Sequence, residues 1–335
     1  MSKIRPWLSI VVPAHNAERF LGTCVASIDP DRHGDVQVVL VDDGSTDATP
    51  KLCDDLADAH GNVNVVHKLN GGPPSARNAG FAWVEADWVW FVDSDDLIAP
   101  GALGILKPLI VETDADAIQI SFVVFSGVDE PRWRPLVPSS QVKRITSDEF
   151  IRGLYRGSYR HYMWTFLVRT ERLRTRNGHT PAHGAVKSAA GPFREEFSLY
   201  DDVVSTEDLL RRISRVDVLG LEMYGYRQIS SSVTHGRSDK AADSGLRAVR
   251  DLQGYEVASD VIRDKIRMEV GLLFSAYKLV EDGDDSEPLK RAIRAEIDSR
   301  VAKVGAAYLG PGRLARYTLM RTGLMDLIIS WRSRG

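Results

Sequence analysis

Acidic residues gather in three short segments of this chain of 335 residues, at positions 42–43, 93–96 and 201–202. Carboxylates bind hard divalent cations such as Mg²⁺ and Mn²⁺, which commonly bridge protein acids to phosphates. They also accept strong hydrogen bonds from a base or a ribose, and they serve as general bases. The bare pattern Asp93-Ser94-Asp95 is equally compatible with a solvated acidic turn, so the elements around it decide its meaning.

The elements around the first two segments predict a parallel sheet with helices on both faces. Short apolar runs rich in β-branched residues are typical of buried strands, and they stand at 8–12, 36–41, 63–66 and 88–92. We expect Pro13 to end the first strand and Asp47 to cap the second helix. Helices are predicted over 18–28, 47–60 and 75–85.

In such a sheet, ligands bind beyond the carboxyl ends of the strands. Several carboxylates at that edge would repel one another unless a cation lay among them, which favours a metal site. The side chains expected there are Asn16, Asp42, Asp43, Asp93, Asp95 and Asp96.

The rest of the chain predicts a less regular second half and a helical end. A strand is expected at 117–124, a helix at 147–155, a strand at 164–168 and loops at 126–144 and 169–191. From about 246 onward the spacing is helical, most clearly at 288–308. We therefore divide the chain into a nucleotide-sugar-binding half (1–125), an acceptor-binding and catalytic-base half of the same domain (126–240) and a helical C-terminal region (241–335).

Composition excludes several classes of protein. The chain has 43% hydrophobic residues, 27% charged residues and a net charge of -3, which predicts a folded protein. This overall charge gives no indication of nucleic-acid binding. Cys24 and Cys53 match no zinc or redox pattern and are expected to be buried, reduced thiols. Without a signal peptide or an apolar stretch of about 18 residues, we expect a cytoplasmic protein, with peripheral contact at the inner face of the cell membrane as an open alternative.

Four motifs, in order, resemble glycosyltransferase family 2. They are the segments 8–22, Val41-Asp42-Asp43-Gly44-Ser45-Thr46-Asp47, 70–80 with Gly71-Gly72 and Arg77, and Phe91-Val92-Asp93-Ser94-Asp95-Asp96. The resemblance implies a Rossmann-like GT-A fold, with a mainly parallel sheet flanked by helices, over about 5–235. It also implies an inverting transfer of a sugar from a nucleotide-sugar, a UDP-sugar by family habit.

The same resemblance implies a division of roles among the site residues. The nucleotide base and ribose are expected on Pro13, Ala14, Asn16, Glu18, Asp42 and Asp43. Asp42 is equally suited to forming the turn with Gly44 and Ser45. Arg77, in the first turn of its helix, is expected at the pyrophosphate. Asp93 and Ser94 are expected at the donor, while Asp95, with Asp93, would bind Mn²⁺ or Mg²⁺.

A later segment resembles the family's catalytic-base motif. In Leu199-Tyr200-Asp201-Asp202-Val203-Val204 the second acid, Asp202, is in register with the base, although Asp201 replaces the usual Glu. The implied mechanism has Asp202 taking the proton of an acceptor hydroxyl. Weaker candidates for acceptor or phosphate contacts are Trp164, Asp201, Arg227 and His235.

Three alternatives stay open from the residues alone. A haloacid-dehalogenase-type phosphatase also has a strand ending in Asp-x-Asp, but its motif opens its domain, and Leu97 replaces the usual threonine or valine. A sugar-phosphate nucleotidyltransferase would need a basic Gly-rich loop where 13–16 stands. A non-catalytic nucleotide-sugar-binding protein would not need the acids Asp93, Asp95 and Asp202.

The C-terminal tail, 311–335, combines five arginines with apolar residues at helical spacing. This basic amphipathic pattern is typical of interfacial helices and of helices docked on a domain with arginines outward. The expected acceptor is a hydroxyl of a glycan, a lipid-linked oligosaccharide or a cell-surface polymer. The tail predicts a peripheral membrane contact if the acceptor is lipid-linked.

Overall fold

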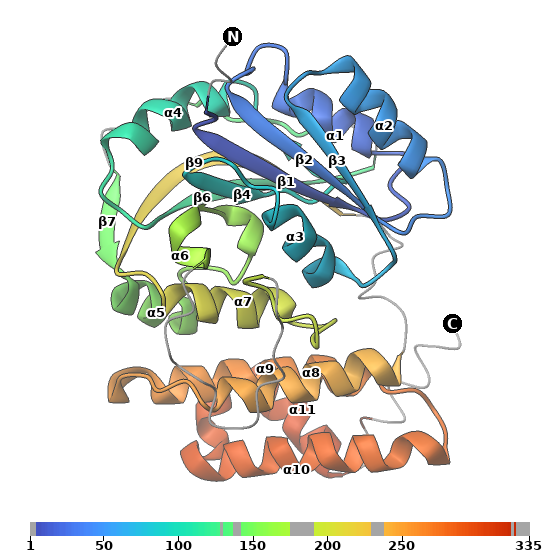
Figure 1. The fold of residues 1–335 in the computed structure, drawn as a ribbon. Helices are drawn as coiled ribbons and strands as arrows, with labels where there is room; N and C mark the ends of the chain where they lie inside the picture. The colour runs from blue at the N-terminus through green and yellow to red at the C-terminus, as the bar shows by residue number, and fades with distance from the viewer. Residues whose placement is uncertain are drawn as a thin grey trace.

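The computed structural model describes residues 5–127, 130–136, 142–174, 191–228, 238–322 and 325. Its centre is a mixed sheet in the order β3-β2-β1-β4-β8-β6-β9-β5, with β7 paired to β9 (Figure 1). The first four strands in sequence pair in parallel, as the apolar runs predict. They are β1 (Leu8–Ala14), β2 (Val36–Asp43), β3 (Val63–Lys68) and β4 (Trp88–Phe91).

The second half of the sheet mixes directions. β8 runs antiparallel to β4 and β6, while β6 and β9 pair in parallel through a bulged register. The long strand β9 therefore continues the sheet beside β6 and also pairs with two short strands. These strands are β5 (Leu97–Ile98), β6 (Ala117–Ser126), β7 (Lys143–Thr146), β8 (Phe166–Arg169) and β9 (Arg215–Gln228).

Helices cover both faces of the sheet because side chains alternate along each strand (Figure 1). In β1, Leu8, Ile10 and Val12 pack towards one set of helices, whereas Val11 packs with the opposite set. The first set is α1 (Leu21–Ile28), α2 (Thr49–Ala59) and α4 (Ala102–Glu112). The opposite set includes α3 (Pro73–Phe81), α5 (Ser147–Arg156), α6 (Thr170–Arg174) and α7 (Asp201–Leu210).

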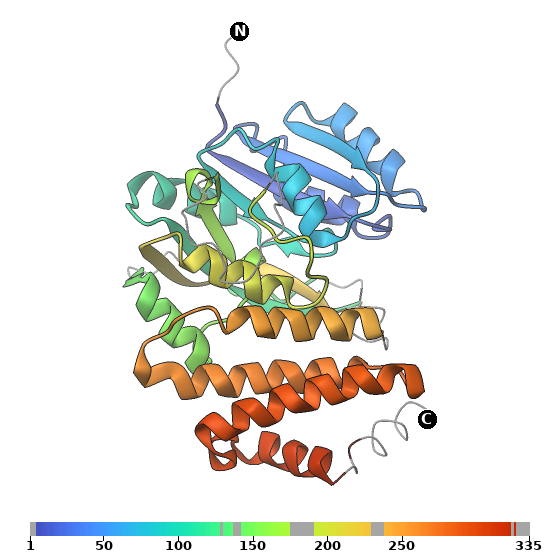
Figure 2. The ribbon, with the colours of Figure 1, turned by 60° about the horizontal axis from the view of Figure 1, so that its bottom comes forward.

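A further helical layer lies beyond α7, at the end of the molecule away from the sheet (Figure 2). Its apolar core is separate, and the buried Arg300 donates to Glu269 at 2.9 Å across it. Tyr200 joins this layer to the start of α7. The helices are α8 (Asp239–Leu252), α9 (Ile262–Leu279), α10 (Glu287–Val304) and α11 (Pro311–Arg321).

Several predicted boundaries are wrong. β1 runs through Pro13, because β4 pairs only as far as Val11 and the missing N–H of Pro13 faces no ladder partner there. The N-cap of α2 is Ala48, not Asp47, although the Asp47 carboxylate accepts from the Thr49 amide at 3.0 Å. The expected loops 126–144 and 169–191 contain β7 and α6.

The two cysteines are free and buried, as predicted. Burial and the neighbouring acids raise the pKa of Cys24 well above its usual value, so its thiol stays protonated. None of the helices in the described part of the chain is both long and apolar enough to cross a membrane.

Candidate active site

The loops that follow β1 and β2 are tied together by Asn16 and Glu18. The Asn16 side-chain oxygen accepts from the Thr46 amide at 2.8 Å, and a Glu18 carboxylate oxygen accepts from the Ala48 amide at 2.9 Å. Asn16 adopts a positive φ of 50°, which asparagine tolerates better than most residues. Both side chains therefore shape the rim of the predicted nucleotide site, above the strand residues Pro13 and Ala14.

Asp42 forms a turn with the residues up to Ser45, as predicted. One of its carboxylate oxygens accepts from the Ser45 amide at 3.0 Å, and the other lies 3.0 Å from Nδ1 of His67. Burial opposes ionisation here, but the hydrogen bonds from Ser45 and His67 outweigh it and lower the pKa of Asp42. Asp42 is thus a satisfied, ionised carboxylate.

Asp43 organises the loop before α3. Its carboxylate accepts from the Lys68 ammonium at 2.5 Å and from the amides of Gly71 and Gly72 at 2.9 and 2.8 Å. Gly72 has a φ of 84°, which favours glycine, and it is the residue from which α3 starts. We call Asp42 and Asp43 the loop acids, because each fixes backbone amides of the surrounding loops.

Asp93, Ser94 and Asp95 lie in a tight turn directly after β4. The Asp96 amide donates to the Asp93 carbonyl at 3.1 Å and closes this turn. The Asp93 amide donates to the Tyr224 hydroxyl at 3.1 Å, and that hydroxyl donates to Asp96 at 2.7 Å. Strand β9 therefore holds the turn through Tyr224, and also through the Arg227 amide, which donates to Asp96 at 2.6 Å.

Asp95 carries an uncompensated charge. Its carboxylate forms no ion pair among the described residues, while Asp93 and Asp96 lie close by in the same turn. Burial, followed by the negative charge of Asp93, raises the pKa of Asp95 to about 6. A carboxylate in this state gains from any cation that arrives.

Arg77 connects this turn to the third acidic segment. Its guanidinium donates to Asp93 at 3.1 Å and to Asp201 at 2.7 Å, and it lies 3.7 Å from Asp202. The side chain is only 5% exposed and packs over the ring of Phe193, with its centre 5.7 Å from the ring centroid. Asp93 and Asp201, which belong to two distant segments of the chain, thus share one buried cation.

The location of Arg77 within its helix differs from the expectation. Because α3 starts at Pro73 and not at residue 75, Arg77 lies two residues further along the helix than predicted, in its second turn. Its guanidinium points at carboxylates instead of standing free beside the helix start. Nε of Arg77 remains buried without a hydrogen-bond partner among the described residues.

Asp201 and Asp202 begin α7, where the helix dipole favours negative charge. Burial, followed by the charge of Asp201, nevertheless raises the pKa of Asp202 to about 8. Among the residues that the structure describes, one Asp202 oxygen is buried without a hydrogen-bond partner. The nearby Arg77 guanidinium and the Met163 backbone lower the pKa only in part. A carboxyl group of this kind is suited to taking up a proton. We call Asp93, Asp95, Asp201 and Asp202 the central acids.

The start of α7 is fixed by the helical layer beyond it. Tyr200 has a φ of 64°, and its hydroxyl donates to the Leu272 carbonyl of α9 at 2.7 Å. The Ser244 hydroxyl of α8 accepts from the amides of Ser198 and Leu199 at 2.8 and 3.2 Å. The C-terminal helices therefore position Asp201 and Asp202, the two central acids at the start of α7.

The weaker candidates lie in different surroundings. Trp164 is only 3% exposed and stacks with Tyr162, Tyr224 and Tyr226, so it belongs to the packing beneath the acidic turn. The Arg227 side chain donates to the Asp95 carbonyl at 2.7 Å and so braces that turn. His235 lies outside the described residues.

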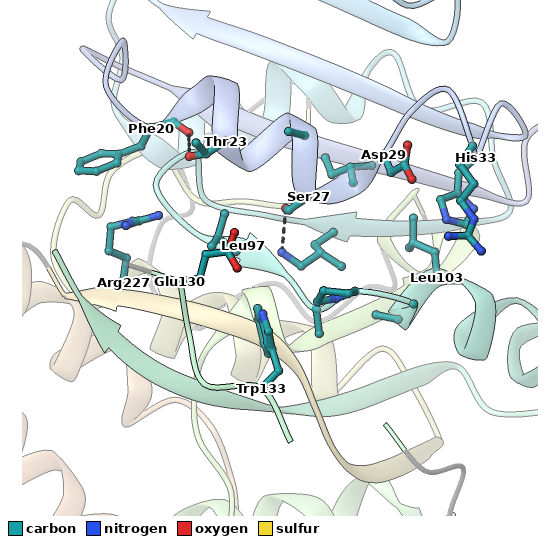
Figure 3. A pocket seen from close by; sticks show the side chains of 18 of the residues that line it. Phe20, Thr23, Ser27, Asp29, His33, Leu97, Leu103, Glu130, Trp133 and Arg227 are labelled. Carbon is teal, nitrogen blue, oxygen red and sulfur yellow. Dashed lines mark hydrogen bonds between the residues drawn. The ribbon is translucent and has the colours of Figure 1, made fainter. Parts of the chain in front are cut away.

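A cavity of about 470 Å³ lies behind the acidic turn, between α1 and β5 (Figure 3). Phe20, which precedes α1, and Thr23 of α1 face it from one side and Trp133 from the other, while Arg227 closes one end. The Ser27 hydroxyl accepts from the Ile98 amide at 2.9 Å across its wall. Arg227 thus belongs both to this cavity and to the support of Asp95.

A metal ion fits the acidic turn only if a bound phosphate group supplies further ligands to it. Within the described ranges, no three His, Cys, Asp or Glu side chains form a group that could hold a metal ion. Asp93 and Asp95 supply two carboxylates. Mg²⁺ is typically bound by one or two carboxylates together with phosphate and water. The residues present therefore suit an ion that binds with a diphosphate.

Comparison with known proteins identifies the family. The model of glycosyl transferase family 2 matches residues 9–184. The chain belongs to glycosyltransferase family 2. The glycosyltransferase EpsJ of Bacillus subtilis is 25% identical over 246 residues, which cover 72% of this chain and 67% of EpsJ. The glycosyltransferase GlyG of Streptococcus pneumoniae is 34% identical over 112 residues, 33% of this chain and 37% of GlyG.

Solved structures confirm the GT-A fold of this family 2 enzyme. TarS of S. aureus, residues 1–349 in complex with UDP-GlcNAc, superposes with a TM-score of 0.66 at 19% identity, covering 97% of this chain and 91% of TarS. The mannosyltransferase PcManGT of Pyrobaculum calidifontis, in complex with GDP-Man and Mn²⁺, gives 0.55 at 18% identity, covering 97% and 85%. The chain is therefore a glycosyltransferase with a GT-A sheet and C-terminal helices.

Sequence reasoning missed several residues that build the site of this glycosyltransferase. Lys68 neutralises Asp43, and Tyr224 holds the acidic turn. The Asn78 side chain donates to the Phe193 carbonyl at 2.9 Å and accepts from the Phe193 amide at 2.9 Å. Asn78 falls inside the motif at 70–80 that resembles the family's, but only the partners of Asn78 and Tyr224 in space give these two residues a role.

Proposed function

We propose that the enzyme transfers a sugar from a nucleotide-sugar, a UDP-sugar in the first instance, to an acceptor hydroxyl with inversion at the anomeric carbon. The observation that carries the proposal is the shared position of Arg77. Its guanidinium contacts Asp93 of the donor motif and also Asp201 and Asp202, so one side chain connects the two segments. A donor diphosphate and an acceptor hydroxyl can meet only where these two segments meet.

In the proposed donor site, the rim formed by Asn16, Glu18 and the loop acids receives the base and the ribose. Pro13 and Ala14 form its floor, because they end the strand beneath these loops. The loop acids stabilise the backbone that surrounds the nucleotide, and one oxygen of either acid can accept from a base N–H or a ribose hydroxyl as well. The diphosphate then extends towards Asp93, Ser94 and Arg77.

In the proposed transfer, Asp202 accepts the proton of the acceptor hydroxyl. As that proton leaves, the acceptor oxygen forms a bond to the anomeric carbon, and the bond from that carbon to the diphosphate oxygen breaks. The electron pair departs with the nucleoside diphosphate, whose charge Arg77 stabilises. A raised pKa favours this role, because it brings the proton affinity of Asp202 towards that needed near neutral pH.

Asp95, with Asp93, would hold the divalent ion Mn²⁺ or Mg²⁺. When bound, the ion supplies positive charge to the leaving diphosphate. PcManGT is described in complex with Mn²⁺ as well as GDP-Man, which supports a metal in this fold. The unneutralised charge of Asp95 supports the same assignment.

The proposed acceptor is a glycan, a lipid-linked oligosaccharide or a cell-surface polymer. One relative, a minor teichoic acid biosynthesis protein of Bacillus subtilis, supports the polymer class; it is 28% identical over 128 residues. Among the aromatic side chains near Asp202, Tyr162 is the outer ring of the stack that contains Trp164, and it is 37% exposed. We assign the acceptor contact to Tyr162 in place of the buried Trp164.

For cell location, we propose a cytoplasmic enzyme that contacts the inner face of the membrane through the segment 311–335. The described part of this segment is α11, on which Arg313, Arg316 and Arg321 alternate with Leu314 and other apolar residues. Met320 anchors α11 in the helical core, so an outward basic face remains.

A screen of nucleotide-sugars by thermal unfolding tests the proposal. A ligand that binds only the folded protein raises the melting temperature, and we expect one donor to do so more strongly with Mn²⁺ or Mg²⁺ than without. The Asp95→Asn variant serves as a matched control, because it keeps the shape of the site and removes the charge. If a donor stabilised both proteins equally with and without metal, the metal assignment to Asp95 would be wrong.

The alternative function, a phosphatase with Asp93 as nucleophile, predicts a different activity. It would release phosphate from simple phosphomonoesters without any nucleotide. The family assignment favours the transferase, and hydrolysis of p-nitrophenyl phosphate by the wild-type protein, lost in Asp93→Asn, would overturn that preference. A non-catalytic binder would show donor stabilisation but no transfer to any acceptor.

A further inference from the structure

A second cavity lies in the helical layer, far from the central acids. It has a volume of about 370 Å³ and is formed where the chain turns from Leu309 into α11, against the side of α9. Three arginines line it: Arg267 from α9, and Arg313 and Arg316 from α11. We call this cavity the arginine pocket. Figure 2 shows that α11 belongs to the end of the molecule opposite the sheet.

The positive charge of the arginine pocket is only partly neutralised. Arg267 pairs with Asp264 one turn earlier in α9. Among the described residues, neither Arg313 nor Arg316 forms an ion pair. Burial, followed by the charges of Arg267 and Arg316, lowers the pKa of Arg313. Guanidinium groups held together without a matching carboxylate create a strong local preference for an anion.

The position of Arg313 is built into the fold. Its guanidinium lies against Gly271 of α9, where a side chain of even one carbon would come within 3.0 Å of Nε. The absence of a side chain at Gly271 therefore gives Arg313 its place along α9. Because α11 begins beside these groups, the positive end of its dipole adds to their charge.

The surroundings of the pocket are apolar and exposed. Tyr308 is 47% exposed, and its ring packs under the guanidinium of Arg263 at 4.3 Å. Leu314, beside Arg313, is 37% exposed. Amphipathic tyrosine, exposed leucine and arginine are side chains that occupy the boundary between lipid headgroups and acyl chains.

We propose that the arginine pocket binds the phosphate group of an anionic membrane lipid. Planar guanidinium groups bind phosphate in a bidentate manner, and a tetrahedral phosphate group has enough oxygens to accept from more than one arginine at once. Tyr308 and Leu314 then enter the headgroup region beside the bound phosphate. The inference rests on the membrane contact proposed above and gives it a defined site, but it does not depend on the transfer reaction.

The test is co-sedimentation of the full chain with vesicles of phosphatidylcholine, with and without phosphatidylglycerol. We expect the wild type to bind only the vesicles with phosphatidylglycerol. The double variant Arg313→Gln/Arg316→Gln should bind roughly thirtyfold more weakly, since each basic residue near an anionic surface contributes about a factor of five. The control variant is Arg291→Gln/Lys303→Gln, which removes the same charge from exposed positions of α10.

The outcomes separate a lipid site from general charge attraction. An equal loss of binding in the control variant would overturn the pocket, and so would equal binding of the wild type to both kinds of vesicle. Stabilisation of the wild type by inorganic phosphate, lost in the double variant, without any vesicle binding would make soluble phosphate the ligand and overturn the lipid assignment. Both variants should keep the donor-induced rise in melting temperature, so failure of the donor site would be seen separately.

Discussion

The loop acids and the central acids lie at the same end of one sheet, yet they differ in how fully hydrogen bonds and basic side chains neutralise them. Asp42 and Asp43 are buried, and each receives hydrogen bonds from backbone amides as well as a basic side chain. Asp93, Asp201 and Asp202 share the single guanidinium of Arg77. The pKa of Asp42 is lowered, whereas that of Asp202 is raised to about 8.

This difference separates carboxylates that stabilise the fold from carboxylates suited to catalysis. Saturated carboxylates stabilise the loops in which they lie, and a ligand changes their energy little. Under-neutralised carboxylates cost stability in the ligand-free protein, and such local cost is concentrated at functional sites. The comparison therefore predicts that substitutions of the loop acids damage folding, while substitutions of the central acids damage transfer and spare or improve stability.

The largest effect is expected for Asp202→Asn. Loss of a general base slows catalysis by a factor of about 10²–10⁴, and we expect kcat to fall in that range while the affinity for the donor persists. Stability should rise at pH 8, because the raised pKa means that the folded protein holds a proton that the unfolded chain releases. Thermal unfolding and steady-state kinetics on the same sample measure both.

Asp201→Asn is the matched control for that experiment. It removes an equal charge one residue away and should leave most of the transfer activity. If Asp201→Asn abolished transfer while Asp202→Asn did not, the base would be Asp201 and the register taken from the family motif would be wrong.

The next effect concerns the cation that the central acids share. Arg77→Met leaves three neighbouring carboxylates without a counter-charge, and we expect the free energy of unfolding to drop by about 3 kcal/mol at pH 8. Arg77→Lys keeps the charge but cannot bridge Asp93 and Asp201 at once. Its free energy of unfolding should therefore lie between those of the wild type and Arg77→Met. Urea unfolding measures both variants. A loss no larger than that of an exposed arginine such as Arg291 would contradict the shared role.

A smaller loss is expected among the loop acids. Asp43→Ala frees the Gly71 and Gly72 amides and the ammonium of Lys68, and unfolding should become about 2 kcal/mol easier. The KM for the donor should rise because α3 loses its fixed start, while kcat should change less. Steady-state kinetics that determine KM and kcat separately, together with urea unfolding, are the measurements. An Asp43→Ala variant of normal stability with a collapsed kcat would place Asp43 among the central acids instead.

Much of the donor half could be predicted from the sequence. β1, β2 and β4 are buried on both faces and therefore appear as unbroken apolar runs, which local patterns reveal well. β9 was missed because its apolar residues are interrupted by Asp217, Gly220 and Glu222, and because its partner β6 lies about 100 residues earlier. The division at 125 and 240 stays a prediction.

The site divides in the same way. The acids themselves follow from motifs, since each motif lies within a few residues. The contacts of Arg77 with Asp201 and of Tyr224 with Asp96 join positions more than 120 apart, and no local spacing carries that information. The charge balance that separates loop acids from central acids could therefore be read only from the folded chain.

The smallest effect is a pH dependence that tests the charge balance directly. With a pKa of about 8, Asp202 is mostly protonated at pH 7, so kcat/KM should rise about fivefold between pH 7 and 8 as the base ionises. Asp201→Asn should move this rise to lower pH, because the neighbouring charge is one cause of the shift. Asp43→Asn should leave its midpoint unchanged. A kcat/KM profile that is flat above pH 6 in the wild type would mean that Asp202 is already ionised in the free enzyme at pH 6, and the contrast between the two acid groups would be wrong.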